Sequence, residues 1–247
     1  MNMLFSQCKA EFKRTVRNKF FVMFSIAMPV VFYFIFSSVI GDDTQVGGTD
    51  WKAYYLMSMT VFSVIGAAIS TLGIRLSQER TQGWVKQLKV TPLPGWVYLS
   101  SKIVTQAILN IGIILLLFII GIFVKGIELT VWQWILCGLW IWIGALPFLA
   151  LGVLIGTSKT TELAQVFSNI VHLGLAILGG LWMPLEIMPT IVQNIGEWLP
   201  TYRYGHGAWN ILAGESPQLV DAGILLLYLV IFMVLSVYIS KRQEAIS

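Results

Sequence analysis

The 247-residue sequence predicts an all-α polytopic membrane protein, because of its composition, its charge-free stretches and the placement of its basic residues. Hydrophobic residues make up 57% of the chain and charged residues 11%, whereas a soluble domain is about 25% charged. So few ionic groups could not cover the surface of a water-soluble fold. The composition therefore excludes a soluble enzyme, a disordered chain and a disulfide scaffold.

Six windows of the sequence contain no Asp, Glu, Lys or Arg. Each has about the 20-residue length that a helix needs to cross a bilayer core about 30 Å thick. The windows are continuously apolar, whereas strands of a membrane barrel would alternate, so we expect helices. In a single membrane domain, 1–247, the predicted spans lie at about 20–41, 53–74, 103–124, 132–156, 163–183 and 222–240.

Basic residues are distributed unequally between the two sides of these predicted spans. With the N-terminus in the cytoplasm, 13 Lys and Arg residues lie on the cytoplasmic side and 3 on the other side. This asymmetry follows the positive-inside rule, and six spans return the C-terminus to the starting side. We therefore predict a multi-pass protein of the cytoplasmic membrane, with both termini in the cytoplasm.

The N-terminal segment, residues 1–19, has the pattern of a basic amphipathic helix that leads into the first span. Its apolar residues recur at steps of three and four, and basic residues occupy the positions between them. The apolar residues are Phe5, Cys8, Phe12 and Val16, and the basic ones are Lys9, Lys13, Arg14 and Arg17. Such a helix can lie on anionic lipid or dock a cytosolic partner, and the two roles are compatible.

The cytoplasmic connection between the second and third spans, residues 75–102, is far longer than a turn needs to be. Bulky apolar residues are interleaved there with charged ones, which favours a short amphipathic helix over a purely solvated loop. Proline cannot continue a helix, so we expect this helix to end at Pro92 and Pro94. The interleaved residues are Leu76, Glu79, Arg80, Trp84, Val85, Lys86, Leu88, Lys89 and Val90.

The predicted outer segment, residues 184–221, is too apolar for a free loop. Four prolines interrupt it, so it cannot form a single helix. We expect short helices that dip into the outer leaflet or pack on the spans, as a lid or as a re-entrant cap. The apolar residues are Ile187, Met188, Ile191, Val192, Ile195, Trp198 and Leu199.

The fifth predicted span carries a polar stripe of Gln165, Ser168, Asn169 and His172, at spacings of three and four. These residues either form hydrogen bonds between helices, worth about 0.6 kcal/mol each, or line a polar path for a substrate. Ion-coupled carriers usually need ionised groups inside the membrane. The charge-free spans therefore disfavour a secondary carrier.

Gly152 and Gly156 form a G-x-x-x-G pattern in the fourth predicted span. Small residues at this spacing let two helices approach closely. The pattern is compatible with packing inside the chain or across a dimer.

Catalytic patterns are missing from the sequence. The histidines are His172 and His206, without metal-ligand spacing, and no G-x-S-x-G nucleophile elbow occurs. Residues 156–160 superficially suggest a phosphate loop but lack the glycines of that motif. We therefore expect no catalytic, metal or cofactor-binding residues, no nucleic-acid partner, and no ATP hydrolysis by this chain itself.

Two motifs carry a resemblance to a known family. Glu79-Arg80-x-x-Gly83 and then Leu88-x-Val90-Thr91-Pro92-Leu93 follow the second predicted span. Met183-Pro184-Leu185-Glu186-x-Met188-Pro189 and then Trp198-Leu199-Pro200 precede the last one. With the basic N-terminal helix and six spans, the chain resembles the membrane subunit of a bacterial type-2 ATP-binding-cassette (ABC) exporter over essentially its whole length.

The resemblance implies a permease that pairs with a separate ATP-binding-cassette ATPase, which would bind the ATP and Mg. Two permeases, as a homodimer or a heterodimer, would complete the transporter in the lipid bilayer, and the turn at 157–162 would make a lesser contact. It implies that residues of a coupling helix contact the ATPase: Glu79, Arg80, Gly83, Trp84, Leu88, Thr91, Pro92 and Leu93. It implies that the outer segment forms a gate: Pro184, Glu186, Met188, Pro189, Leu199 and Pro200.

Three other classes of protein remain as alternatives. A membrane sensor or immunity protein would share the predicted topology but would need no ATPase. A secondary carrier is disfavoured by the charge-free spans, and a membrane-embedded enzyme by the lack of paired carboxylates or an activated nucleophile. An apolar path with a few polar residues suits an amphipathic or lipophilic cargo such as a drug, an antibiotic, a peptide or a lipid.

Overall fold

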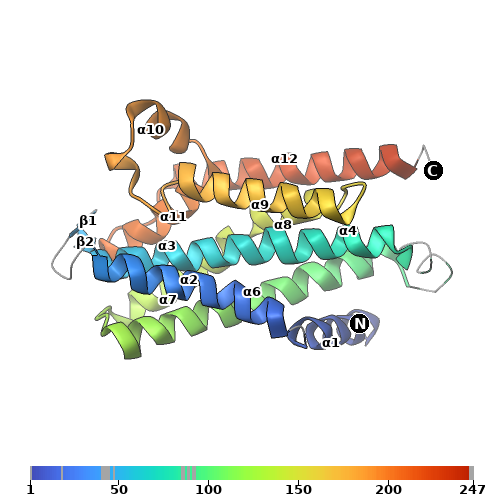
Figure 1. Ribbon diagram of the computed structural model, residues 1–247, viewed down its shortest axis with the longest axis horizontal. Helices are drawn as coiled ribbons and strands as arrows, with labels where there is room; N and C mark the ends of the chain where they lie inside the picture. The colour runs from blue at the N-terminus through green and yellow to red at the C-terminus, as the bar shows by residue number, and fades with distance from the viewer. Residues whose placement is uncertain are drawn as a thin grey trace.

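The computed structural model describes residues 2–17, 19–39, 45–46, 48–84, 87, 90 and 93–244. Over this part of the chain the fold is all-α, apart from one short antiparallel pair, β1 (Gln45–Val46) with β2 (Thr49–Asp50). The long helices run side by side along the longest axis of the molecule, and both termini lie at the same end (Figure 1). The fold is therefore the helical bundle that the composition predicts.

The helices that build the bundle differ widely in length. In chain order they are α1 (Asn2–Val16), α2 (Lys19–Val39), α3 (Trp51–Gly66), η1 (Ala67–Leu72), α4 (Gly73–Thr81), α6 (Gly95–Lys125), α7 (Val131–Gly144), α8 (Leu146–Ile155), α9 (Thr161–Leu178) and α12 (Leu219–Glu244). Three shorter helices lie between α9 and α12: η2 (Leu185–Ile187), α10 (Thr190–Gly196) and α11 (Pro200–Leu212).

Five helices in the described residues are long and apolar enough to cross a membrane, and each overlaps a predicted span. They are Trp51–Thr81, Gly95–Lys125, Val131–Ile155, Thr161–Leu178 and Leu219–Gln243. The first predicted span, 20–41, falls on α2, of which Ala27–Ser37 forms a shorter apolar stretch. The multi-pass membrane architecture is confirmed, and the sixth crossing stays a prediction.

Two helix boundaries differ from the sequence-based expectation. The helix of the predicted span 163–183 ends at Leu178, because Gly179 and Gly180 follow and Gly180 turns the chain with a φ of +74°. The connection predicted at 75–102 is largely helical, since α4 continues to Thr81 and α6 already begins at Gly95. The two helices therefore bring the residues of this connection close to the body of the bundle.

The helix formed by α3, η1 and α4 is the centre of the bundle. In its most apolar window 83% of the residues are buried, against 33% for Gly95–Lys125 and 17% for Leu219–Gln243. Its middle part, η1, is a π-helix, a wider turn that is rare and is found most often at functional positions. One continuous helix therefore connects the β1–β2 end of the molecule with the end that carries the termini (Figure 1).

The G-x-x-x-G pattern packs α8 against this central helix. A Cβ atom at Gly152 would lie 2.2 Å from the carbonyl oxygen of Ala68 in η1, and one at Gly156 would lie 2.6 Å from Leu76 Cβ in α4. Both distances are too short for any larger residue without movement of the backbone or of the side chain. The close packing that the pattern predicts is therefore made within the chain.

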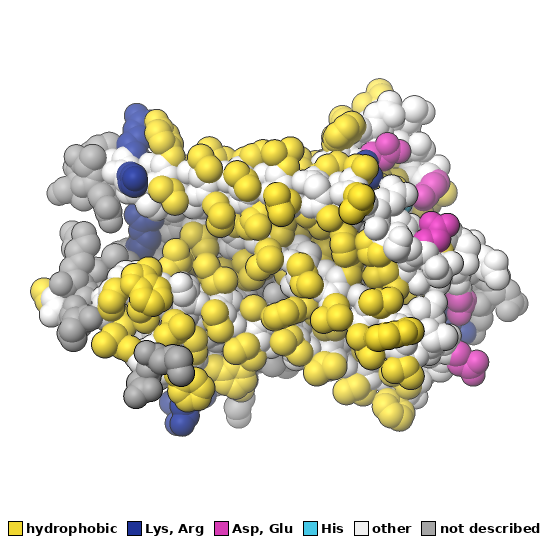
Figure 2. All heavy atoms as spheres, turned by 180° about the vertical axis from the view of Figure 1, so that it is seen from behind, with side chains coloured by type: hydrophobic (Ala, Val, Ile, Leu, Met, Phe, Trp, Pro, Cys, Tyr) yellow, Lys and Arg dark blue, Asp and Glu magenta, His cyan; other side chains and the backbone are white. Residues whose placement is uncertain are grey.

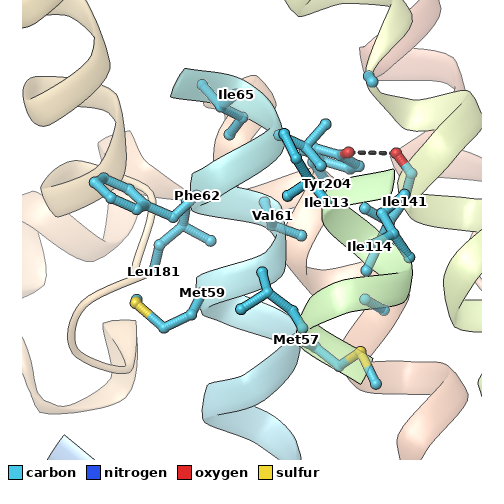
Figure 3. Packing of buried hydrophobic residues seen from close by; sticks show 14 of the residues in the cluster. Met57, Met59, Val61, Phe62, Ile65, Ile113, Ile114, Ile141, Leu181 and Tyr204 are labelled. Carbon is cyan, nitrogen blue, oxygen red and sulfur yellow. Dashed lines mark hydrogen bonds between the residues drawn. The ribbon is translucent and has the colours of Figure 1, made fainter. Parts of the chain in front are cut away.

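The core on the other side of α3 is formed with α6, α7 and α11. Figure 3 shows Met57, Val61 and Ile65 of α3 near Ile113 and Ile114 of α6, and all of them belong to one buried cluster. The hydroxyl of Tyr204, from α11, donates a hydrogen bond to the carbonyl oxygen of Ile141 in α7. This hydrogen bond holds α11 against α7 inside the bundle.

The surface shows the polarity expected of a membrane protein. Figure 2 shows a broad band of hydrophobic side chains between two polar ends, with Lys and Arg gathered at one end and Asp and Glu at the other. The basic end is the end at which both termini lie, and the acidic end carries α10 and the β1–β2 pair (Figures 1 and 2). The arrangement agrees with the unequal distribution of basic residues in the sequence.

Candidate functional site

A cluster of charged side chains is buried at the basic end, where α1, α4 and α6 meet. The carboxylate of Glu79, whose side chain is only 3% exposed, lies 2.9 Å from Lys102 Nζ of α6 and 2.7 Å from Arg14 Nη1 of α1. The hydroxyl of Tyr98 also donates a hydrogen bond to this carboxylate. Glu79 is therefore bonded to both neighbouring helices at once.

Glu11 of α1 is the second carboxylate of the cluster. It lies 3.0 Å from Lys102 Nζ and 3.9 Å from Arg75 Nη1, and Lys102 is only 2% exposed. Arg75 also donates a hydrogen bond to the hydroxyl of Thr15, which itself donates to the backbone oxygen of Glu11 at 2.8 Å. We name the five charged residues Glu11, Arg14, Arg75, Glu79 and Lys102 the α1–α4–α6 charge cluster.

Helical spacing explains why the cluster forms. Residues three or four positions apart share a face of a helix. Arg75 and Glu79 are four apart on α4, Tyr98 and Lys102 are four apart on α6, and Glu11 is three residues before Arg14 on α1. Each helix therefore presents two polar groups on the face that it turns to the other two.

Most of the apolar stripe of α1 faces away from this cluster, whereas Cys8 contacts the backbone of Ser101 in α6. Phe5, Phe12 and Val16 are exposed by 42% or more, whereas Glu11 and Thr15 are buried. An amphipathic helix whose apolar residues point outward beside a membrane protein is suited to lie in the lipid interface. Helix α1 is thus fastened to the bundle by charge and presents apolar side chains to its surroundings.

A second set of hydrogen bonds ties α4 to the turn between α8 and α9 and to the end of α12. Arg80 donates to the side-chain oxygen of Gln243, and the amide of Gln243 donates to Thr157 O at 2.9 Å. The hydroxyl of Ser77 donates to Thr160 O at 3.1 Å. Helix α4 is therefore the element of the basic end that is bonded to α1, α6, α12 and the 157–161 turn.

The residues predicted to contact the ATPase differ in their exposure and in their bonds to the rest of the chain. Trp84 is 47% exposed, and Gly83 follows the C-cap residue of α4 with a φ of +78°, whereas Glu79 is buried and Arg80 is bonded to Gln243. Leu93 is half-buried. The remaining predicted contacts lie outside the described residues: Leu88, Thr91 and Pro92.

The carboxylate of Glu79 is bonded to Lys102, Arg14 and Tyr98 of its own chain. These bonds favour a role in holding α4 to α1 and α6, and the contact of Glu79 with the ATPase stays a prediction. Among the predicted contacts that the structure describes, Trp84 is the one with an exposed side chain.

Sequence reasoning missed Tyr98 and Lys102 as partners of Glu79, and Glu11 as the second carboxylate that binds Lys102. A signal was present: Glu11 is the one acidic residue in 1–41, and Glu79 is the one acidic residue in 51–127. A carboxylate placed alone in a basic segment can be expected to pair within the protein, because a charge beside the membrane needs a partner.

The four residues of the predicted polar path do not share one environment. Ser168 is buried, because α9 turns Ala164, Ser168 and Ala176 toward the bundle, whereas Gln165 and Asn169 are exposed. His172 is half-buried. Its Nε2 atom lies 3.1 Å from Phe62 O, and its ring lies 4.3 Å from the ring of Phe62.

Asn169 and His172 line an apolar groove between α2, α3 and α9, with a volume of about 360 Å³. Its other walls include Pro29, Phe62 and Gly66. The groove has the size and the mainly apolar lining of a small-molecule site, with a few polar groups.

At the acidic end, α11 is bound to the start of α12 by a buried carboxylate. Asp221 is fully buried, and its oxygens lie 3.2 Å from Arg203 Nη1 and 2.8 Å from His206 Nδ1. Sequence reasoning did not anticipate this group.

The residues predicted to form an outer gate differ in exposure. Pro184 and Pro200 are buried, Met188 and Leu199 are half-buried, and Glu186 and Pro189 are exposed. Gln193 fixes the loop by donating to Glu186 O at 3.1 Å and to Met188 O at 2.8 Å.

A bundle of membrane-length apolar helices, basic at one end and acidic at the other, defines a multi-pass membrane protein, and comparison with known proteins gives its family. The sequence model described as "ABC-2 type transporter" matches residues 4–212, so the chain belongs to the ABC-2 type transporter family. This family consists of membrane permeases, and membership implies association with an ATPase subunit.

Two relatives are named as permeases. The chain is 47% identical to the "Putative transport permease YvfS" of Bacillus subtilis (strain 168) over 246 residues, which cover 100% of both chains. It is 25% identical to the linearmycin resistance permease protein LnrN of the same organism over 160 residues, covering 61% of this chain and 41% of that protein. These relatives support a permease subunit of a transporter.

Proposed function

We propose that this chain is the permease subunit of an ATP-driven exporter in a bacterial cytoplasmic membrane, with both termini in the cytoplasm. A separate ATP-binding-cassette ATPase binds and hydrolyses ATP with Mg, and two permeases form the pathway. The observation that carries this proposal is the α1–α4–α6 charge cluster, which includes Glu79, the first residue of the predicted coupling segment. A movement of that segment would be transmitted to α1, α4 and α6 together.

The mechanism follows from the position of α4. Closure of the ATPase on ATP shifts the segment after Thr81, and α4 is continuous with η1 and α3 as far as Trp51 at the other end of the molecule. Because Glu79 and Arg75 bond to α1 and α6, these helices move with α4. Residues 184–221, fastened through Asp221 and Tyr204, would form the gate that opens outward.

The cargo class is proposed from the groove between α2, α3 and α9. Its lining is largely apolar, with Ser63, Ser70, Asn169 and His172 as polar groups, and it suits an amphipathic or lipophilic compound. The relative LnrN is named for resistance to linearmycin, which supports a drug or antibiotic as one form of this cargo.

Replacing Trp84 with alanine should abolish most of the association with the ATPase, because large exposed aromatic side chains dominate many interfaces. The measurement is purification of the tagged chain from its native membrane in mild detergent, with detection of the co-purified ATPase and its activity. Trp198→Ala is the matched control, since Trp198 is 65% exposed in the outer segment.

Two results would count against the coupling interface and the exporter. If the Trp84 variant retained the ATPase as well as the Trp198 variant does, the contact at 84 would be wrong. If the unmodified, folded chain carried no ATPase at all, a sensor or immunity protein or a carrier would become the better explanation.

The second permease is proposed to cover the outer face of α9. Gln165 and Asn169 are exposed there among Val166, Phe167 and Ile170, and amide groups facing lipid are costly without a partner. A partner helix would satisfy them and would close the groove that contains His172.

Asn169→Cys, in a chain whose Cys8 and Cys137 are replaced by serine, should cross-link into a dimer in native membranes under mild oxidation. Leu227→Cys, on the exposed face of α12, is the control and should remain monomeric. Equal cross-linking at both positions would indicate random collision, and cross-linking at 227 alone would place the dimer interface on α12.

A further inference from the structure

An apolar groove runs between α6, α8 and α12 at the basic end of the bundle, with a volume of about 500 Å³. It is separate from the groove beside His172, and none of the residues considered so far for coupling or transport lines it. Its walls include Ile103 of α6, Leu149 and Val153 of α8, and Met233 and Val237 of α12.

The length of the groove matches one leaflet of a bilayer. Its lining positions on α12 extend from Leu229 to Lys241 and recur at steps of three and four, so they form one face of the helix. Twelve residues at about 1.5 Å each correspond to about 18 Å. Half of a hydrocarbon core about 30 Å thick is about 15 Å.

The groove is charged at one end. Lys241 lines it and is exposed, and no ion pair to Lys241 occurs within the described residues. The hydroxyls of Ser236 and Ser240 are the other polar side chains in the lining, and that of Ser236 is bonded to Phe232 O at 2.7 Å. An apolar channel with a cation at its mouth is complementary to an acyl chain that carries an anionic head group.

A second groove adjoins the first one and allows a comparison of the charges in their linings. It shares Leu146 and Leu229 with the first groove and continues toward Trp140 and Ala222, but no Lys, Arg, Asp or Glu lines it. The two grooves together are apolar except at Ser236, Ser240 and Lys241, which line the groove at the basic end. Lys241 therefore distinguishes a site for charged lipid in one leaflet from a general contact with acyl chains.

We propose that the groove between α6, α8 and α12 binds an anionic phospholipid from the leaflet at the basic end. One acyl chain lies along Met233 and Val237, and the ammonium group of Lys241 contacts the lipid phosphate. A second copy of the chain is a poorer occupant, because a twofold contact through this face would bring two Lys241 side chains together.

The proposed lipid site lies next to the hydrogen bonds that hold the end of α12 to α4. Lys241 lies two residues before Gln243, which bonds both Arg80 of α4 and the backbone of Thr157. A bound lipid would hold the end of α12 where it contacts the helix that leads to the coupling segment.

Binding is tested by native mass spectrometry of the purified, delipidated full chain. The added lipids are phosphatidylglycerol and phosphatidylcholine with identical acyl chains, each titrated separately. One phosphatidylglycerol should be retained in preference to phosphatidylcholine. Lys241→Gln should weaken this binding about fivefold, the effect of one basic residue near an anionic head group.

Matched variants distinguish binding of the lipid in the groove from general electrostatic attraction between the anionic lipid and the basic end of the protein. Arg242→Gln removes the same charge from the neighbouring position, which does not line the groove, and should leave the affinity near that of the unmodified chain. Val237→Trp should fill the groove and remove the bound lipid, whereas Val234→Trp, at a similarly exposed position of α12 outside the lining, should not. A melting curve for each variant verifies folding.

Three outcomes of the lipid titrations would overturn the proposal. They are equal retention of the two lipids, equal loss for the variants at 241 and 242, and unchanged binding in a folded Val237→Trp variant. Competition by glycerol 1-phosphate, which has the head-group phosphate but no acyl chain, would equally exclude a lipid site and indicate a simple anion site. None of these results depends on whether the chain is an exporter.

Discussion

Replacing Glu79 with glutamine should destabilise the protein by about 3 kcal/mol and release α1 from the bundle. The carboxylate bonds Lys102, which is 2% exposed, and its loss leaves that buried ammonium group with one carboxylate in place of two. Three basic groups of the cluster would then share Glu11 as their one carboxylate, and removing one partner from a buried set of charges costs more than the ion pair itself contributes, because the remaining charges are poorly compensated. The measurement is thermal unfolding in detergent, together with tryptic cleavage of α1 in intact membranes.

The control for this prediction is Arg14→Gln, which removes the exposed partner of the same carboxylate. Arg14 is 49% exposed, and an ion pair open to solvent contributes about 1 kcal/mol or less. The double variant Glu79→Gln with Lys102→Met should be less destabilised than the sum of its single variants, since both charges are removed together. A Glu79 variant that melts like the Arg14 variant would contradict the role of the cluster in fastening α1.

The effect of Glu79→Gln on transport distinguishes two roles for this residue. Glu79 either holds helices together within the chain or contacts the ATPase directly. If Glu79 acts through α1 and α6, its replacement should reduce transport while the ATPase remains bound, because Trp84 is left in place. Loss of the ATPase together with transport would instead place Glu79 in the interface. Transport and co-purification are therefore measured on the same preparations.

Gly152→Ala should be the most damaging single substitution among the described glycines of the membrane helices. The added Cβ would lie 2.2 Å from the carbonyl oxygen of Ala68, and this atom belongs to the backbone of η1. Neither helix can yield by rotating a side chain, so α8 must move away from the central helix. Overpacking of this kind costs about 1–3 kcal/mol.

Gly112→Ala is the matched control for this prediction. Gly112 also lies inside a membrane helix, α6, but nothing lies within 4 Å of a Cβ at that position. Alanine has the higher helix propensity, so this variant should melt at the same temperature as the unmodified protein or slightly above it. Equal behaviour of the two variants would show that α8 and η1 do not depend on close contact.

The membrane helices could be predicted from the sequence because charge is excluded from lipid. The windows at 53–74, 103–124 and 222–240 lie inside helices that are long and apolar enough to cross a membrane. The ends of the helices were less predictable, since they depend on local backbone geometry. Leu178 ends α9 because Gly180 has a positive φ, and a count of apolar residues does not contain this information.

The charge cluster could not be predicted from periodicity alone. The pattern around Glu79 indicates an amphipathic helix, and it places Glu79 and Arg75 on one face. Which face is buried depends on Glu11 and Lys102, which are 68 and 23 residues away in the sequence. Alternation of charged and apolar residues describes one helix, whereas burial of a charge depends on the helices that it meets.

The cluster also has a consequence for the order of membrane insertion. Helix α1 is synthesised before α6, so Glu11 meets Lys102 only after a further stretch of nearly a hundred residues has been made. Until then Phe5, Phe12 and Val16 can hold α1 at the lipid surface. Helix α1 therefore reaches its final position only when α6 is present, and its docking reports that α1, α4 and α6 have come together.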